Sequence, residues 1–79
     1  MSTRTQTRKP SDERAYWTGY AFRLGSRDGA EDVAEDPGTY TPTYGNLWIG
    51  RDYELASAYA DGYVASWNAG IDEWEARAR

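Results

Sequence analysis

One short motif occurs twice in this chain, and it constrains the fold more than any other feature of the sequence. In each copy a small residue precedes a tyrosine, and the pair recurs four residues later. The two copies read Ala15-Tyr16-x-x-Gly19-Tyr20 and Ala58-Tyr59-x-x-Gly62-Tyr63. Residues four apart lie on one face of an α-helix, so each copy places a small ridge beside an aromatic ridge. The repeat therefore predicts two helices with similar faces.

The first helix is predicted over about residues 12–25. Ser11 can act as its N-cap, and two acidic residues follow in the first turn, where the helix macrodipole favours negative charge. Gly25-Ser26 is a typical helix stop, because glycine readily adopts the left-handed conformation that ends many helices.

The second helix is predicted over about residues 52–69, with Asp52 as its N-cap. Its aromatic ridge consists of Leu55, Tyr59, Tyr63 and Trp67, and its small ridge consists of Ala58, Gly62, Ser66 and Gly70. Beyond Gly70 the pattern allows two alternatives. Either the helix continues to residue 78, which we favour, or it breaks and a short third helix packs back.

Gly19 and Gly62 occupy the same position in the two copies of the motif. Glycine inside a helix costs about 1 kcal/mol relative to alanine, so its use in both helices indicates a shared reason. Removing both β-carbons lets two helix backbones approach closely. We therefore expect the helices to pack through Gly19 and Gly62, within one chain or between two subunits.

The segment between the helices is predicted to be a connector. Residues 28–38 are acidic and contain two turn signals, which indicates a solvated loop. Residues 39–49 are β-prone around Gly45-Asn46, and here two alternatives stand. One is a short β-hairpin, and the other is an irregular loop whose Trp48 and Ile49 plug the helix pair.

Charge divides the chain into a basic leader and an acidic body. Residues 1–10 carry three basic residues and no acid, which predicts a flexible basic arm before a single small helical domain over residues 11–79. Residues 28–75 carry eleven acidic residues against Arg51, a net charge of −10. Such a body repels phosphate backbones and attracts basic surfaces, so direct nucleic-acid binding by the body is not expected.

Composition argues against several functional classes. The chain has no His and no Cys, and therefore lacks the commonest general base and the thiolate nucleophile. We expect no catalysis, no metal and no cofactor. No apolar run approaches the roughly 20 residues that cross a bilayer, so we expect a cytoplasmic protein that does not enter membranes.

The repeated motif resembles the ribosome modulation factor family, whose members are small bacterial proteins with two helices that each carry a glycine–aromatic step. The resemblance covers about residues 14–25 and 57–68. It implies a two-helix fold and a ribosome-binding function. The acidic body and the long connector without a Cys-Pro-Tyr element depart from the family's pattern. By size and charge the chain also resembles small acidic phage anti-CRISPR inhibitors, which would act in the host cytoplasm.

These observations favour a mainly α, non-enzymatic binding protein that masks the basic surface of a nucleic-acid-handling complex, such as a CRISPR surveillance complex. The expected partner-binding residues are Asp28, Glu31, Asp32, Glu35, Asp36, Trp48, Asp72, Glu73 and Glu75. One alternative is a ribosome or RNA binder that uses Arg4, Arg8 and Lys9. The other is a helical assembly subunit, for which a homodimer is expected.

Overall fold

The computed structural model describes residues 10–78, with side chains from residue 12 onward. Helix α1 spans Pro10–Glu35 and helix α2 spans Tyr53–Ala78. The mainly α prediction is confirmed, and the described part of the chain contains no strand. Of the predicted arm over residues 1–10, Pro10 instead begins α1, and residues 1–9 lie outside the described residues.

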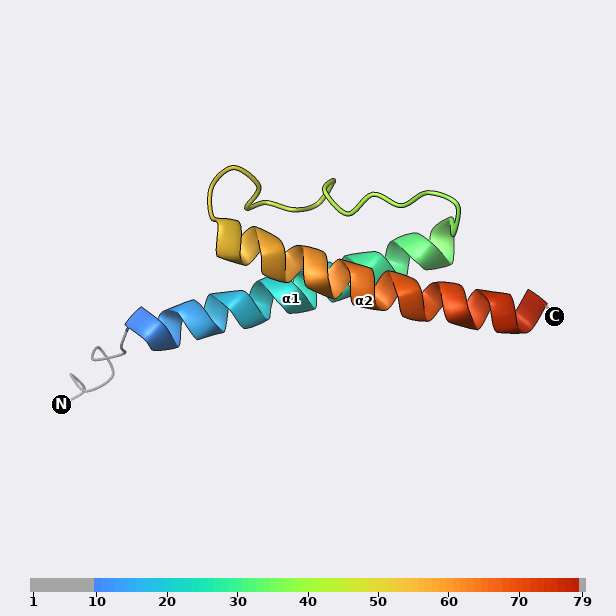
Figure 1. Ribbon diagram of the computed structural model, residues 1–79, viewed down its shortest axis with the longest axis horizontal. Helices are drawn as coiled ribbons and strands as arrows, with labels where there is room; N and C mark the ends of the chain where they lie inside the picture. Colours follow the sequence, from blue (N-terminus) through green and yellow to red (C-terminus); the bar gives the residue numbers. More distant parts are fainter. Residues whose placement is uncertain (1–9, 79) are drawn as a thin grey trace.

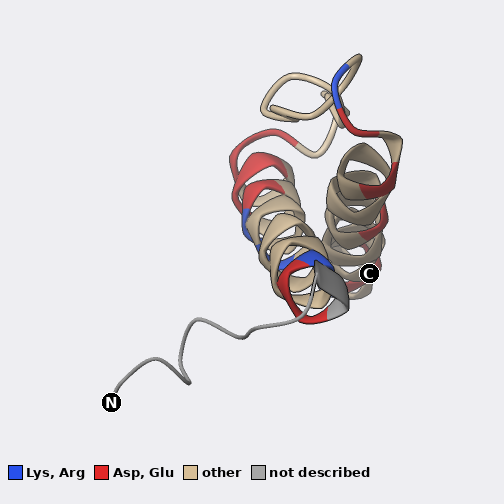
Figure 2. Ribbon diagram, turned by 90° about the vertical axis from the view of Figure 1, so that its left-hand side faces the viewer, with Lys and Arg blue, Asp and Glu red and all other residues tan. Residues whose placement is uncertain are grey.

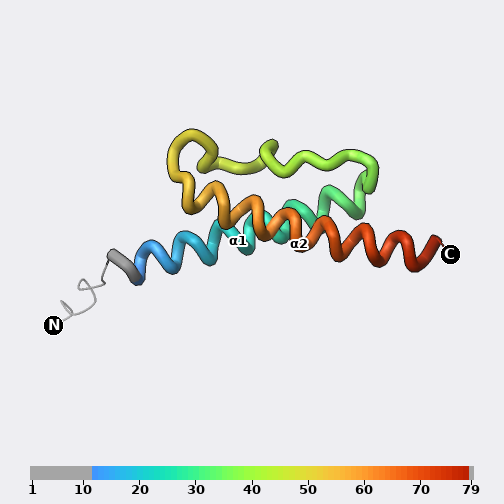
Figure 3. The backbone as a smooth tube through the Cα atoms, in the orientation of Figure 1, coloured from blue at the N-terminus to red at the C-terminus, as the bar shows by residue number. Residues whose placement is uncertain are grey.

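The two helices run in the same direction and cross at a shallow angle (Figure 1). This is possible because the connector, residues 36–52, returns along the helix pair from the end of α1 to the start of α2 (Figure 3). The result is an elongated molecule of 60 × 26 × 15 Å. The C-terminal ends of both helices therefore lie toward the same end of the molecule.

Helix α1 extends ten residues beyond its predicted end at residue 25. A Cβ atom on Gly25 or Gly29 would overlap the backbone carbonyl oxygen of Tyr59 or Tyr63. The prediction of a stop at Gly25 is therefore wrong, because this glycine allows α2 to approach and does not end the helix. The predicted acidic connector over residues 28–38 is also wrong for its first eight residues, which belong to α1.

The helix crossing is lined by small residues from both helices. On α1 these are Ala21, Gly25 and Gly29, and on α2 they are Ala58, Gly62, Ser66 and Gly70. A Cβ on Gly62 would overlap the carbonyl of Phe22, and the hydroxyls of Ser26 and Ser66 are hydrogen-bonded at 2.5 Å. The prediction that the helices pack through both Gly19 and Gly62 is wrong for Gly19, since a Cβ on Gly19 would meet only Arg23 of its own helix.

The aromatic ridge predicted on α2 forms the core. Tyr59 and Tyr63 are fully buried, and Leu55 and Trp67 are nearly so. The rings of Tyr59 and Tyr63 stack at 6.3 Å, and those of Tyr63 and Trp67 stack at 6.0 Å. The equivalent residues of α1 differ, because Tyr16 and Tyr20 are 52% and 38% exposed.

The connector is an irregular loop that covers this ridge, so the β-hairpin alternative is wrong. Tyr40 packs edge-on against Tyr63 and Trp67, and Trp48 packs against Tyr59. The polar groups of the connector bond to the helices, as where the amide of Asn46 donates to the carbonyl of Ala56 at 3.0 Å. These contacts take the place of a strand ladder.

Helix α2 continues through Gly70 to Ala78, in agreement with the favoured alternative. A Cβ on Gly70 would overlap the side chain of Val33. Val33 is 7% exposed and closes the core at this end of the crossing. The last turns of α2, by contrast, are exposed.

Candidate partner-binding surfaces

Two of the predicted partner-binding acids, Asp28 and Asp32, are hydrogen-bonded within the fold. The hydroxyl of Tyr59 donates to Asp28, and that of Tyr63 donates to Asp32 at 2.6 Å. Burial is the main cause that raises the pKa of both tyrosines, and the neighbouring carboxylates raise it further. Both aspartates are half-buried, and their bonds stabilise the two tyrosines at the crossing.

The other predicted partner-binding acids of this segment, Glu31, Glu35 and Asp36, are exposed at the C-terminal end of α1, where Figure 2 shows acidic residues in red. Asp36 follows the helix and accepts hydrogen bonds from the Thr39 hydroxyl at 2.6 Å and the Gly38 amide at 2.9 Å. These two bonds lower its pKa, with the Thr39 bond contributing most. Glu31 and Glu35 are exposed on the last turns of the helix.

A shallow cavity of about 410 Å³ lies beside this helix end. It is lined by Asp32, Glu35, Asp36, Thr39, Thr41 and Tyr44. Its walls therefore combine carboxylates, hydroxyls and one aromatic ring, and Tyr44 is 90% exposed.

The three predicted acids of α2, Asp72, Glu73 and Glu75, are exposed near its C-terminal end. Glu73 lies 3.9 Å from Arg77, an exposed pair one turn apart that contributes little to stability. A groove of about 410 Å³ between the helix ends is lined by residues of both helices, which include Ala34, Glu73 and Trp74. The parallel helices therefore bring the exposed acids of α1 and α2 to one end of the molecule.

Trp48 lies far from these acids, near the start of α2. The centroid of its ring lies 6.3 Å from that of Tyr20 and 6.4 Å from that of Tyr59. The side chain packs on the core and remains partly exposed. The predicted plug therefore involves Trp48 alone, because Ile49 is 50% exposed.

A larger cavity, of about 560 Å³, opens beside Trp48 at the other end of the molecule. It is lined by Glu13, Arg14, Trp17, Trp48, Asp52 and Leu55. Of these, only Trp48 was predicted as a site residue. No local sequence signal marks the cavity. The first turns of α1 and the start of α2 meet there, and the residues that they bring together, such as Arg14 and Asp52, are 38 positions apart in the sequence.

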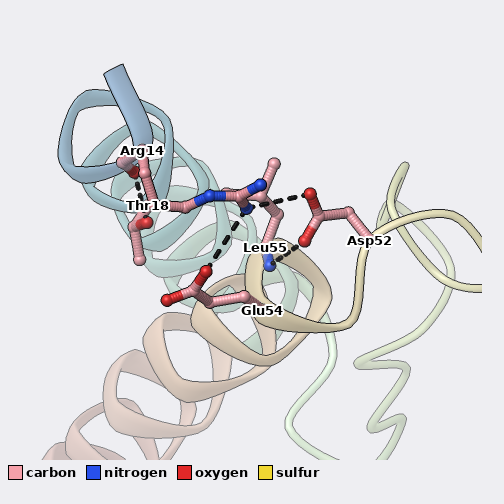
Figure 4. Close-up of polar contacts among 5 residues, drawn as sticks. All are labelled: Arg14, Thr18, Asp52, Glu54 and Leu55. Carbon is pink, nitrogen blue, oxygen red and sulfur yellow. Dashed lines mark hydrogen bonds and ion pairs between the residues drawn. The ribbon is translucent and has the colours of Figure 1, made fainter. Parts of the chain in front are cut away.

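Arg14 connects the two helices at this cavity (Figure 4). Its guanidinium donates to Asp52 at 2.9 Å and lies 3.4 Å from Glu54. Asp52 also caps α2 as predicted, since its carboxylate accepts a bond from the amide of Leu55 at 3.1 Å. This cap, together with Arg14, lowers the pKa of Asp52, and the bond to Asp52 raises the pKa of Arg14.

Across the described residues, no three acidic side chains come together as a group that could hold a metal ion. Neither of the two described helices is long and apolar enough to cross a membrane.

Comparison with known proteins assigns no family to this arrangement. No protein-family model matches the chain, and no curated protein or solved structure matches it either.

Proposed function

We propose that this chain is a non-enzymatic binding protein that inhibits a nucleic-acid-handling complex by masking its basic surface. A CRISPR surveillance complex is one such target. The observation that carries the proposal is the gathering of exposed acids from both helices at one end of the molecule. These acids are Glu31, Glu35, Asp36, Asp72, Glu73 and Glu75.

Physical chemistry connects this surface to the proposed role. Carboxylates on a rigid helix pair can meet the Lys and Arg side chains that otherwise contact phosphates. Long-range attraction raises the association rate and weakens as salt is added. The chain also lacks His and Cys, so binding rather than catalysis fits its composition.

The test is a tagged pull-down from nuclease-treated host lysate at low and high salt, read by mass spectrometry. The variant combines Glu31→Lys and Glu35→Lys, which leaves the internally bonded Asp28 and Asp32 intact. Its control is Asp61→Lys, which reverses an exposed charge near the middle of α2. We expect the double variant to lose on the order of tenfold in recovery of a nucleic-acid-binding complex, and the control to lose little.

The recovered complex is then assayed for nucleic-acid binding with and without the purified protein. Masking predicts competition that disappears in the double variant. A complex that binds nucleic acid equally well in the presence of the protein would refute the proposal.

A second candidate function is ribosome or RNA binding, as the resemblance to ribosome modulation factors implies. It is favoured by the exposed aromatic side chains of Tyr16 and Trp17, which lie near Arg14 and follow a basic leader in the sequence. Exposed aromatic rings can stack on unpaired bases. Deletion of residues 1–9 and Trp17→Ala should then weaken binding to ribosomal RNA in a filter assay, whereas the proposed inhibitor would retain its target.

No observation favours the assembly subunit. In that function the glycines would pack between copies, but Gly62 meets Phe22 and Ser26 of its own chain.

A further inference from the structure

The cavity of about 560 Å³, where α1 passes the start of α2, has two aromatic walls. Trp17 comes from α1 and is 46% exposed, and Trp48 comes from the connector. Tyr20 lies between them and contacts both edge-on, with ring centroids at 5.6 Å from Trp17 and 6.3 Å from Trp48. Since Trp48 also packs on the buried Tyr59, both indoles are held in place before any ligand arrives.

The charge around the cavity is negative. Glu13 and Asp52 line it, and Glu54 lies beside Arg14, so the side chains at the cavity carry three carboxylates and one guanidinium. Asp52 stays ionised at neutral pH, because the amide of Leu55 and Arg14 lower its pKa. An anionic ligand such as a phosphate is repelled, and a cation is attracted.

The contacts of Arg14 show which chemical group these carboxylates bind. The guanidinium of Arg14 occupies the space between Asp52 and Glu54, with half of its side chain exposed. Cations also bind favourably over the face of an indole ring, which is the strongest of the aromatic cation acceptors.

We propose that this cavity receives the cationic head group of an arginine or lysine side chain from the surface of a protein partner. Trp17 and Trp48 supply the aromatic faces, and Glu13 and Asp52 supply the counter-charge. The inference rests on the proposed function, because it identifies a residue type on the basic surface that the protein engages. It places that contact at the opposite end of the molecule from the clustered acids.

The first experiment titrates the full chain with N-acetyl-arginine amide and follows the indole N–H signals of its four tryptophans by NMR. The signals of Trp17 and Trp48 should shift in a saturable way, and those of Trp67 and Trp74 should not. The matched control probe is N-acetyl-citrulline amide, which has nearly the same shape and no charge. Equal shifts with both probes, or none at Trp17 and Trp48, would overturn the proposal.

Variants then decide the sign of the ligand's charge. Trp17→Ala should weaken binding roughly two- to fivefold. Trp74→Ala removes a tryptophan of similar exposure that lies outside this cavity, and should leave binding unchanged. Glu13→Gln should weaken binding as well. Arg14→Gln should tighten it up to about fivefold, because it removes the competing positive charge.

The opposite result for Arg14→Gln, weaker binding of the cation, would contradict the proposal. So would tighter binding of a nucleoside monophosphate than of the arginine probe, which would identify a nucleobase site. Glu13→Gln keeps the test valid if Arg14→Gln unfolds, since Glu13 is an exposed residue of the first turn of α1.

Failure here is distinct from failure of the proposed function. The titration uses a purified protein and a small probe, and the lysate assay depends on acids at the other end of the molecule. A bound probe with no basic complex recovered supports the cavity and refutes the inhibitor. The reverse pattern refutes the cavity alone.

Discussion

At the scale of single residues, glycine decides how closely the two helices approach. Gly62→Ala should lower the free energy of unfolding by roughly 1–3 kcal/mol, because the new Cβ overlaps the Phe22 carbonyl and the backbones must separate. Gly19→Ala is the matched control. Its Cβ would lie 3.4 Å from the Arg23 side chain, which is an ordinary contact. The free energy of unfolding should therefore rise by up to about 1 kcal/mol, because alanine favours a helix more than glycine does. Urea unfolding of both variants measures these changes. Equal changes in the free energy of unfolding would contradict the close backbone contact at Gly62.

The buried tyrosines predict a loss of stability in alkali. Burial and Asp28 raise the pKa of Tyr59 in the folded protein, so its neutral form is favoured there. The unfolded chain releases this proton near pH 10, and stability should therefore fall as the pH rises above about 10. Denaturant unfolding should show that the free energy of unfolding falls less steeply with rising alkaline pH in Tyr59→Phe than in wild type. Tyr44→Phe, at a 90% exposed position, should behave like wild type.

At the scale of elements, Asp52 both caps α2 and connects it to α1. Asp52→Ala should lower the thermal midpoint more than Asp52→Asn, because asparagine can still cap but cannot pair with Arg14. The folded pKa of Asp52 is lowered, so its contribution is present above the ordinary aspartate value of about 4 and is lost as the pH falls. Thermal unfolding between neutral and acidic pH should show that Asp52→Asn loses less stability on acidification. An acid response identical to wild type would count against this role.

The same element explains why part of the fold is predictable and part is not. The start of α2 and its buried ridge follow from residues three or four apart, which a sequence pattern displays directly. The end of α1 does not, because a glycine inside a helix and a glycine that ends one look alike locally. At Gly25 the approach of Tyr59 decides between them.

At the scale of the whole molecule, parallel helices place like partial charges together. Acidic side chains near the C-terminal ends are repelled by the negative ends of the helix macrodipoles, whereas acidic side chains at the N-terminal ends are attracted by the positive ends. Glu35→Gln should therefore raise the free energy of unfolding, and Glu13→Gln should lower it, each by roughly 0.3–1 kcal/mol at low salt. Both differences should shrink at high salt. Two changes of the same sign would show that the end of the helix does not determine the effect.

The sequence alone determined the mainly helical class, the core ridge of α2, the cap at Asp52 and the acidic character of the body, because these depend on composition and on neighbours within one or two helical turns. Only the tertiary structure decided that the helices run parallel, that Asp28 is bonded to Tyr59, and that Trp17 and Trp48 share a cavity. These features join residues about 30–40 positions apart. Such pairings depend on how the connector returns along the helices, and no local periodicity records that path.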